Sequence, residues 1–90
     1  MDVRRKVTIV NSAGLHARPC HAIVAAANTF SSTFQVGFEG RMVNGKSILQ
    51  LMTLVAGPGA ELELCCEGDD AESLADAVAE LIERGFGEST

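Results

Sequence analysis

The stretch AGLHARPCHAIVAAAN, residues 13–28, leads from a loop into a helix. Its apolar residues recur at helical spacing, at Cys20, Ile23, Val24 and Ala27. Proline fits a helix only within the first turn, where its missing N–H costs no hydrogen bond, so Pro19 must lie in that turn. The spacing therefore predicts a helix over 17–28 that begins close to His16.

Alternation of apolar and polar residues on either side of this helix predicts strands. One strand is predicted over 3–9, followed by turn residues at 11–14. A hairpin is predicted over 34–44, with its turn at Gly40. A further strand over 61–66 alternates leucines with glutamates, which is typical of a strand with one buried and one mostly polar face.

Two more helices complete the chain. Ser47 and Gln50 have the S-x-x-Q form of a capping box, which predicts a second helix that ends before Gly57. A third helix is predicted after Asp69 and Asp70, which offer an N-cap, and it carries an apolar stripe of Leu74, Val78, Leu81 and Ile82. Gly85 is placed to end this helix.

The predicted order is strand, helix, two strands, helix, strand, helix, without an internal repeat or linker. We expect a single domain over 1–90 of the α+β class, an open-faced sandwich whose helices cover one face of the sheet. Spacing alone leaves the strand directions open.

Composition excludes several classes of function. The net charge of -5 leaves no basic surface of the kind that nucleic acids require, and Trp and Tyr are absent. No apolar run approaches the roughly 20 residues of a membrane span, and the N-terminal residues do not form a signal-peptide core. The odd number of cysteines, 3, argues for reduced thiols rather than a disulfide scaffold. We expect a cytoplasmic protein that binds neither nucleic acid nor membrane.

The hexapeptide GLHARP, residues 14–19, resembles the active-site signature of the HPr family of phosphocarriers in the bacterial phosphotransferase system. The segment NGKSI, residues 44–48, is similar to the family's regulatory serine region. The resemblance implies an antiparallel four-stranded sheet with three helices, in a monomer without cofactor or metal. It also implies that the chain is a stoichiometric carrier rather than an enzyme. The implied partners are enzyme I, enzyme IIA components and a kinase/phosphorylase acting on the serine.

The resemblance implies roles for individual residues. His16 is the phosphorylated residue, Arg18 its cationic helper and Ser47 a regulatory phosphorylation site. The residues that support the histidine are Gly14, Ala17 and Pro19. The docking surface for partner enzymes includes Ile48, Leu49 and Met52, although at least half of these could equally belong to the core.

Elementary chemistry agrees with the roles of His16 and Arg18. A helix N-terminus presents unpaired amides and a partial positive charge, which suit a phosphoryl group on a histidine there. The neutral imidazole is the competent nucleophile, and a guanidinium can fork onto phosphoryl oxygens. Gly14 permits a tight approach and Pro19 stiffens the turn.

Several alternatives stay open. Ser47 has a complete structural explanation as a helix cap, so its regulatory role is one of two interpretations. Cys20, one turn from His16, suggests a metal site, but a second ligand cluster is missing and His21 falls on another face of the helix. The rival functions are a regulatory binding module of the nitrogen-type branch, without sugar transport, and, more remotely, a cysteine enzyme that uses Cys20 with His21.

Overall fold

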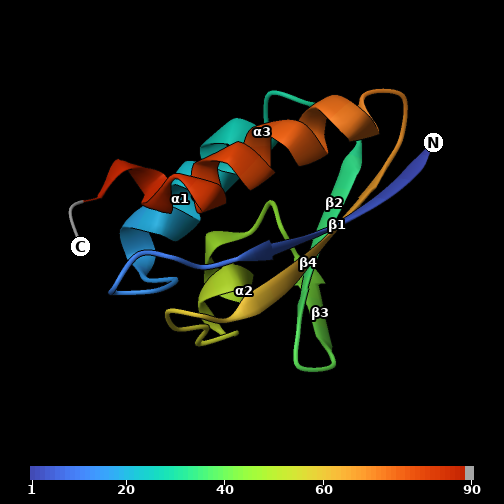
Figure 1. The fold of residues 1–90 in the computed structure, drawn as a ribbon. Helices are drawn as coiled ribbons and strands as arrows, with labels where there is room; N and C mark the ends of the chain where they lie inside the picture. Colours follow the sequence, from blue (N-terminus) through green and yellow to red (C-terminus); the bar gives the residue numbers. More distant parts are fainter. Residues whose placement is uncertain (89–90) are drawn as a thin grey trace.

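The computed structural model describes residues 1–88, in which three α-helices and a short 3-10 turn pack with one four-stranded sheet (Figure 1). The elements in chain order are β1 (Asp2–Thr8), α1 (Ala17–Ala27), β2 (Thr33–Phe38), β3 (Arg41–Asn44), α2 (Ile48–Met52), β4 (Glu61–Glu67), α3 (Ala71–Glu83) and η1 (Gly85–Gly87). This order is the predicted one. The helix that begins at Ala17 and the end of α3 just before Gly85 agree with the sequence pattern.

The sheet has the strand order β1-β4-β2-β3, and every neighbouring pair is antiparallel. The last strand in sequence, β4, is thus inserted between β1 and β2. In its register Leu62 lies opposite Val7, and Leu64 lies opposite Val36. The antiparallel arrangement that the family resemblance implied is confirmed.

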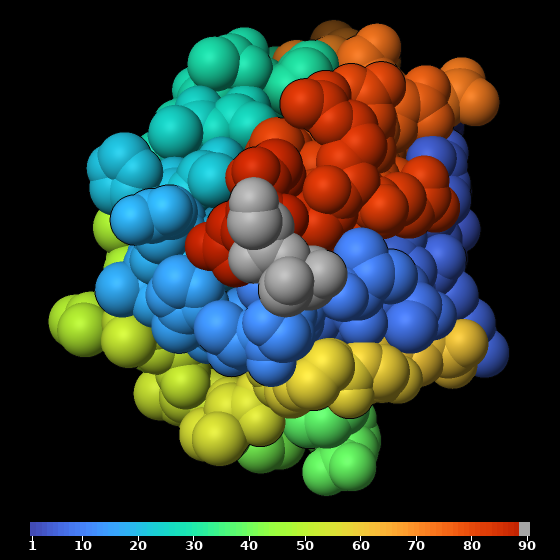
Figure 2. All heavy atoms as spheres, turned by 60° about the vertical axis from the view of Figure 1, so that its left-hand side comes forward, coloured from blue at the N-terminus to red at the C-terminus, as the bar shows by residue number. Residues whose placement is uncertain are grey.

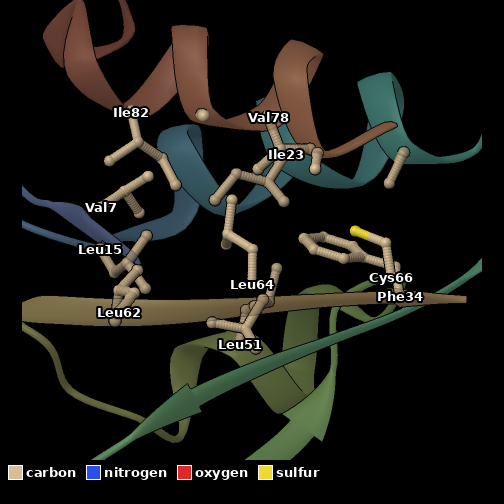
Figure 3. Close-up of a cluster of buried hydrophobic side chains, with 14 of the residues drawn as sticks. Val7, Leu15, Ile23, Phe34, Leu51, Leu62, Leu64, Cys66, Val78 and Ile82 are labelled. Atoms are coloured by element: carbon tan, nitrogen blue, oxygen red, sulfur yellow. The ribbon is translucent and has the colours of Figure 1, made fainter. Parts of the chain in front are cut away.

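The core lies between one face of the sheet and the helices. Leu62, Leu64 and Cys66 of β4 point toward Ile23 of α1 and Val78 of α3 (Figure 3). Each of these side chains is essentially buried, and full burial of a side chain of this size contributes about 1.5–3 kcal/mol to folding. The intervening residues of β4 are exposed or half-buried on the opposite face, namely Glu61, Glu63, Cys65 and Glu67. The open-faced sandwich is confirmed.

The second helix ends at Met52, before Gly57 as predicted, but its capping box is only half formed. The Ser47 hydroxyl accepts the N–H of Gln50 at 3.2 Å, as predicted. The Gln50 side chain instead accepts the N–H of Asn44 at 2.9 Å, because the N–H of Ser47 already donates to the carbonyl of Asn44 at 3.2 Å. The glutamine therefore fastens α2 to the end of β3.

The N-cap that we predicted from the acidic pair before α3 is also incomplete. Asp70 occupies the N-cap position but makes no side-chain cap. Its carboxylate accepts the N–H groups of Ser31 and Ser32, each at 2.9 Å, and both serine hydroxyls. Hydrogen bonds from these serines, led by the Ser32 hydroxyl, lower the pKa of Asp70 to about 2. The carboxylate thus joins the start of α3 to the chain between α1 and β2.

Candidate functional site

The loop before α1 is hydrogen-bonded to the segment that follows α2. The N–H of Leu15 donates to the carbonyl of Ala56 at 2.9 Å, and the Leu15 side chain is buried. Gly14 has φ +70°, and a Cβ atom at this position would lie 2.6 Å from the oxygen of Ala56 and 2.9 Å from Cα of Gly57. Only glycine combines this conformation with this contact. The loop therefore approaches α1 in one defined position.

His16 is the N-cap residue of α1 and has an extended backbone conformation. Its side chain does not cap the helix, and 41% of it is exposed. The first N–H groups of a helix have no acceptor within that helix, so they are available to an anion at this end. The structure thus presents a solvent-accessible imidazole at a helix N-terminus.

The imidazole of His16 also contacts Glu88, near the C-terminal end of the described chain. The Nε2 atom of His16 lies 3.0 Å from Oε2 and 3.4 Å from Oε1 of Glu88. Glu88 is itself held by Asn11, whose Nδ2 donates to Oε1 of Glu88 at 3.0 Å and to the carbonyl of Gly14 at 2.9 Å. Asn11 is fully buried and the Glu88 side chain is 13% exposed, so the carboxylate is firmly placed.

The contact with Glu88 distinguishes the two ring nitrogens. A carboxylate can only accept a hydrogen bond, so Nε2 carries the proton in this contact. In the neutral ring Nδ1 then keeps its lone pair. The contact with Glu88 therefore leaves Nδ1 as the ring nitrogen that can act as a nucleophile.

The sequence pattern did not indicate that Glu88 and Asn11 lie beside His16. They come from opposite ends of the chain and meet because η1 turns sharply after α3. Gly85, Phe86 and Gly87 all have positive φ, and Phe86 packs against the core. The paired glycines of GFGE were the one local signal of this turn, and nothing in them indicated its contact with His16.

Arg18 lies in the first turn of α1, two residues after His16, and its side chain is exposed. Within residues 1–88 it makes neither a hydrogen bond nor an ion pair. Ala17 begins the helix and Pro19 is buried in its first turn, as the pattern predicted. A guanidinium without a fixed partner beside the histidine can turn toward an arriving anion.

The residues predicted to dock partners divide between surface and core. Leu49 is 79% exposed and Met52 is also exposed, whereas Ile48 is half-buried and packs against the core. Helices α1 and α2 contact each other, and in Figure 2 the loop before α1 (blue) lies beside the segment around α2 (yellow-green). The helix that carries Leu49 and Met52 therefore lies beside the loop that leads to His16.

The described structure does not support the cysteine-enzyme or metal-site alternatives. Cys20 is buried, and burial raises the pKa of its thiol above its ordinary value, so it is poorly suited to act as a nucleophile. His21 is exposed on another side of α1. Among the described residues no group of three or more His, Cys, Asp and Glu side chains could hold a metal. In the same part of the chain, no helix has the length and apolar character needed to cross a bilayer.

Fold and site together define a small α+β protein that carries an accessible histidine at the start of its first helix. The model of the PTS HPr component phosphorylation site family matches residues 3–84. The chain is 41% identical to the phosphocarrier protein HPr of Treponema pallidum over 96% of this chain and 98% of that protein. It is 37% identical to the HPr-like protein Crh of Halalkalibacterium halodurans over 91% of this chain and 98% of that protein.

A solved structure gives the same result. The crystal structure of HPr from Thermoanaerobacter tengcongensis superposes with a TM-score of 0.93 at 40% identity, covering 98% of this chain and 99% of that one. The chain therefore belongs to the HPr family of phosphocarrier proteins of the phosphotransferase system.

Proposed function

We propose that the chain accepts a phosphoryl group from phosphorylated enzyme I on Nδ1 of His16 and passes it to an enzyme IIA component. The observation that carries the proposal is the contact of Nε2 with Glu88, which leaves Nδ1 as the free nucleophile at a helix N-terminus. In this proposal each chain accepts one phosphoryl group and passes it on before it accepts the next, so the protein is a carrier rather than an enzyme.

In the forward step the lone pair of Nδ1 attacks phosphorus as the bond between phosphorus and the donor breaks. The electron pair of the broken bond stays on the donor. Nε2 keeps its proton, so the product ring of His16 is positively charged, and the Glu88 carboxylate faces that charge. Nδ1 and Nε2 lie on different edges of the ring, so the carboxylate does not stand in the path of the phosphoryl group.

Arg18 and the helix N-terminus stabilise the phosphoryl group in this proposal. Phosphoryl transfer passes through a loose transition state whose charge is spread over the outer oxygens of the phosphoryl group. Positioning of this group and neutralisation of its charge therefore lower most of the barrier to transfer. The exposed guanidinium of Arg18 and the first N–H groups of α1 are the available donors. Gly14, Ala17 and Pro19 hold the backbone that presents them.

Phosphorylation with purified enzyme I and phosphoenolpyruvate tests the proposal. The wild-type chain should gain one acid-labile phosphoryl group, and His16→Ala should gain none. His21→Ala is the matched control, because it removes the other histidine from the same helix, and it should be labelled like wild type. Label that persists in His16→Ala would refute the assignment.

We also propose Ser47 as a site of regulatory phosphorylation by a serine kinase. Ser47 is half-buried at the N-cap of α2, the helix that also carries the exposed residues Leu49 and Met52. A phosphate at this position would add negative charge to the docking surface and weaken the binding of an acidic partner. Unchanged affinity for enzyme I after incorporation of phosphoserine at 47 would contradict this role.

One alternative is a regulatory binding module of the nitrogen-type branch that is not coupled to sugar transport; one similar protein is called HPr-like rather than a phosphocarrier. Such a module would keep the fold and bind partners without passing on a phosphoryl group. Transfer from the labelled chain to an enzyme IIA component distinguishes the two. Label that accumulates on His16 and does not move to any sugar-specific component would favour the module.

A further inference from the structure

The side-chain amide of Asn11 is fully buried, and only one of its two polar atoms has hydrogen-bond partners within residues 1–88. Nδ2 donates to the carbonyl of Gly14 at 2.9 Å and to Oε1 of Glu88 at 3.0 Å. Oδ1 is buried without a partner in the same part of the chain, which is unfavourable. Because unpaired buried acceptors are uncommon in folded proteins, this arrangement requires a reason.

The two acceptors fix the orientation of this amide. Rotation of the side chain by half a turn would place Oδ1 against the two oxygens that Nδ2 now contacts, and both hydrogen bonds would be lost. The carbonyl of Gly14 also accepts the N–H of His16 at 3.0 Å, so it would keep a donor without Asn11. The need for a donor at position 11 therefore comes from Glu88 rather than from Gly14.

Glu88 uses a different oxygen for each of its two side-chain partners. Oε1 accepts from Asn11, and Oε2 lies 3.0 Å from Nε2 of His16. The turn of η1 passes close to Asn11, since a Cβ atom at Gly85 would lie 3.8 Å from Cβ of Asn11. Figure 2 shows this end of the described chain (red) beside the loop before α1 (blue). Without Asn11, the one partner left to the carboxylate within residues 1–88 would be the imidazole, and the carboxylate could turn toward solvent.

We infer that Asn11 is a positioning residue that sets how strongly His16 holds a phosphoryl group, because it fixes the Glu88 carboxylate against Nε2. The inference rests on the proposed function, in which Nδ1 forms the bond to phosphorus as the bond to the donor breaks. Nε2 keeps its proton in this step, so the phosphorylated ring carries a positive charge that the neutral nucleophile does not. A carboxylate fixed 3.0 Å from Nε2 therefore stabilises the phosphorylated state more than the free state.

The equilibrium between the phosphorylated and the free chain measures this effect directly. The chain is incubated with a catalytic amount of enzyme I and with phosphoenolpyruvate and pyruvate at fixed ratios, and the phosphorylated fraction is measured at each ratio. Enzyme I speeds the approach to this equilibrium without moving it, so a change in docking does not affect the result. Asn11→Ala should lower the equilibrium constant for phosphorylation about fivefold. Asn11→Val should do the same, and it fills more of the buried space should Asn11→Ala not fold.

A double variant separates an effect through Glu88 from an effect on the loop. In the Glu88→Ala background, Asn11→Ala should change the equilibrium constant less than about twofold, because the carboxylate that it positions is gone. A fivefold fall in both backgrounds would show that Asn11 acts through the loop alone, and this inference would be overturned.

Asn28→Ala is the control, because Asn28 is an exposed asparagine at the C-cap of α1, the other end of the helix from His16. Its equilibrium constant should equal that of wild type. An unchanged equilibrium constant for Asn11→Ala would overturn this inference and leave the proposed function intact. An absence of label on the wild-type chain would overturn the proposed function, and this inference with it.

Discussion

Replacement of Gly14 by alanine tests the architecture that presents His16. The added Cβ would lie 2.6 Å from the oxygen of Ala56 and 2.9 Å from Cα of Gly57, and both neighbours are backbone atoms that cannot turn aside. The left-handed conformation alone costs about 1–2 kcal/mol for alanine. The loop must also move, which breaks the hydrogen bond from Leu15 to Ala56, worth about 1 kcal/mol, and disturbs the buried Leu15 side chain. We expect a total loss of about 3 kcal/mol.

Gly40→Ala provides the matched control for this prediction. Gly40 has a similar φ of +83°, but a Cβ there would meet nothing within 4 Å. The two variants therefore share the conformational cost and differ only in the contact with the backbone of residues 56 and 57. Gly40→Ala should lose about 1 kcal/mol.

Urea denaturation of the two variants gives the free energies of unfolding, and enzyme I-dependent labelling gives the consequence for the site. Gly14→Ala should be the less stable by about 2 kcal/mol, and it should also be phosphorylated more slowly because His16 is displaced. Equal losses for the two variants would show that the loop does not rest on Ala56, and the reasoning would be refuted.

Three further predictions concern other polar contacts. Asp70 has a folded pKa of about 2, below the ordinary value, so its contribution to stability is present above about pH 4 and is lost as the pH falls toward 2. Asp70→Asn should therefore lower the Tm at pH 7. In thermal melts the difference in Tm between wild type and this variant should shrink at acid pH, and a difference that does not change with pH would contradict this. Ser47→Ala should cost about 1 kcal/mol in urea denaturation through the lost cap, with labelling of His16 unchanged, and slower labelling would give Ser47 a role in transfer. Glu88→Ala should slow phosphorylation by about tenfold in a quenched time course, whereas the exposed control Glu83→Ala should not. Equal phosphorylation rates for Glu88→Ala and wild type would show that Glu88 has no role in the reaction of His16.

Local patterns predicted those parts of the structure that depend on local interactions. The start of α1 follows from Pro19 and the apolar spacing after it, and the two faces of β4 follow from its alternating glutamates and leucines. The antiparallel strand directions came from the family resemblance, since periodicity does not encode the pairing of β4 with β1. His16 at a helix N-terminus was likewise predictable, because both the motif and the helix boundary are local.

The remaining parts depend on contacts between distant residues. Glu88 reaches His16 across 72 positions of the chain, and this requires the left-handed turn of η1. Gln50 was predicted to close the capping box by accepting the N–H of Ser47. That N–H donates instead to the carbonyl of Asn44 at the end of β3, and Gln50 accepts the N–H of Asn44. Asp70 was expected to cap α3 but is engaged by two serines that precede β2. In each case a polar side chain had a choice of partners that the tertiary structure decided.

The most direct measurement follows the two ring nitrogens of His16 by ¹⁵N and ³¹P NMR before and after phosphorylation. The unphosphorylated neutral ring should carry its proton on Nε2, and the phosphorylated ring should show coupling between phosphorus and Nδ1. A proton on Nδ1 in the free protein, or phosphorus bonded to Nε2, would contradict the claim that Glu88 selects the nucleophilic atom.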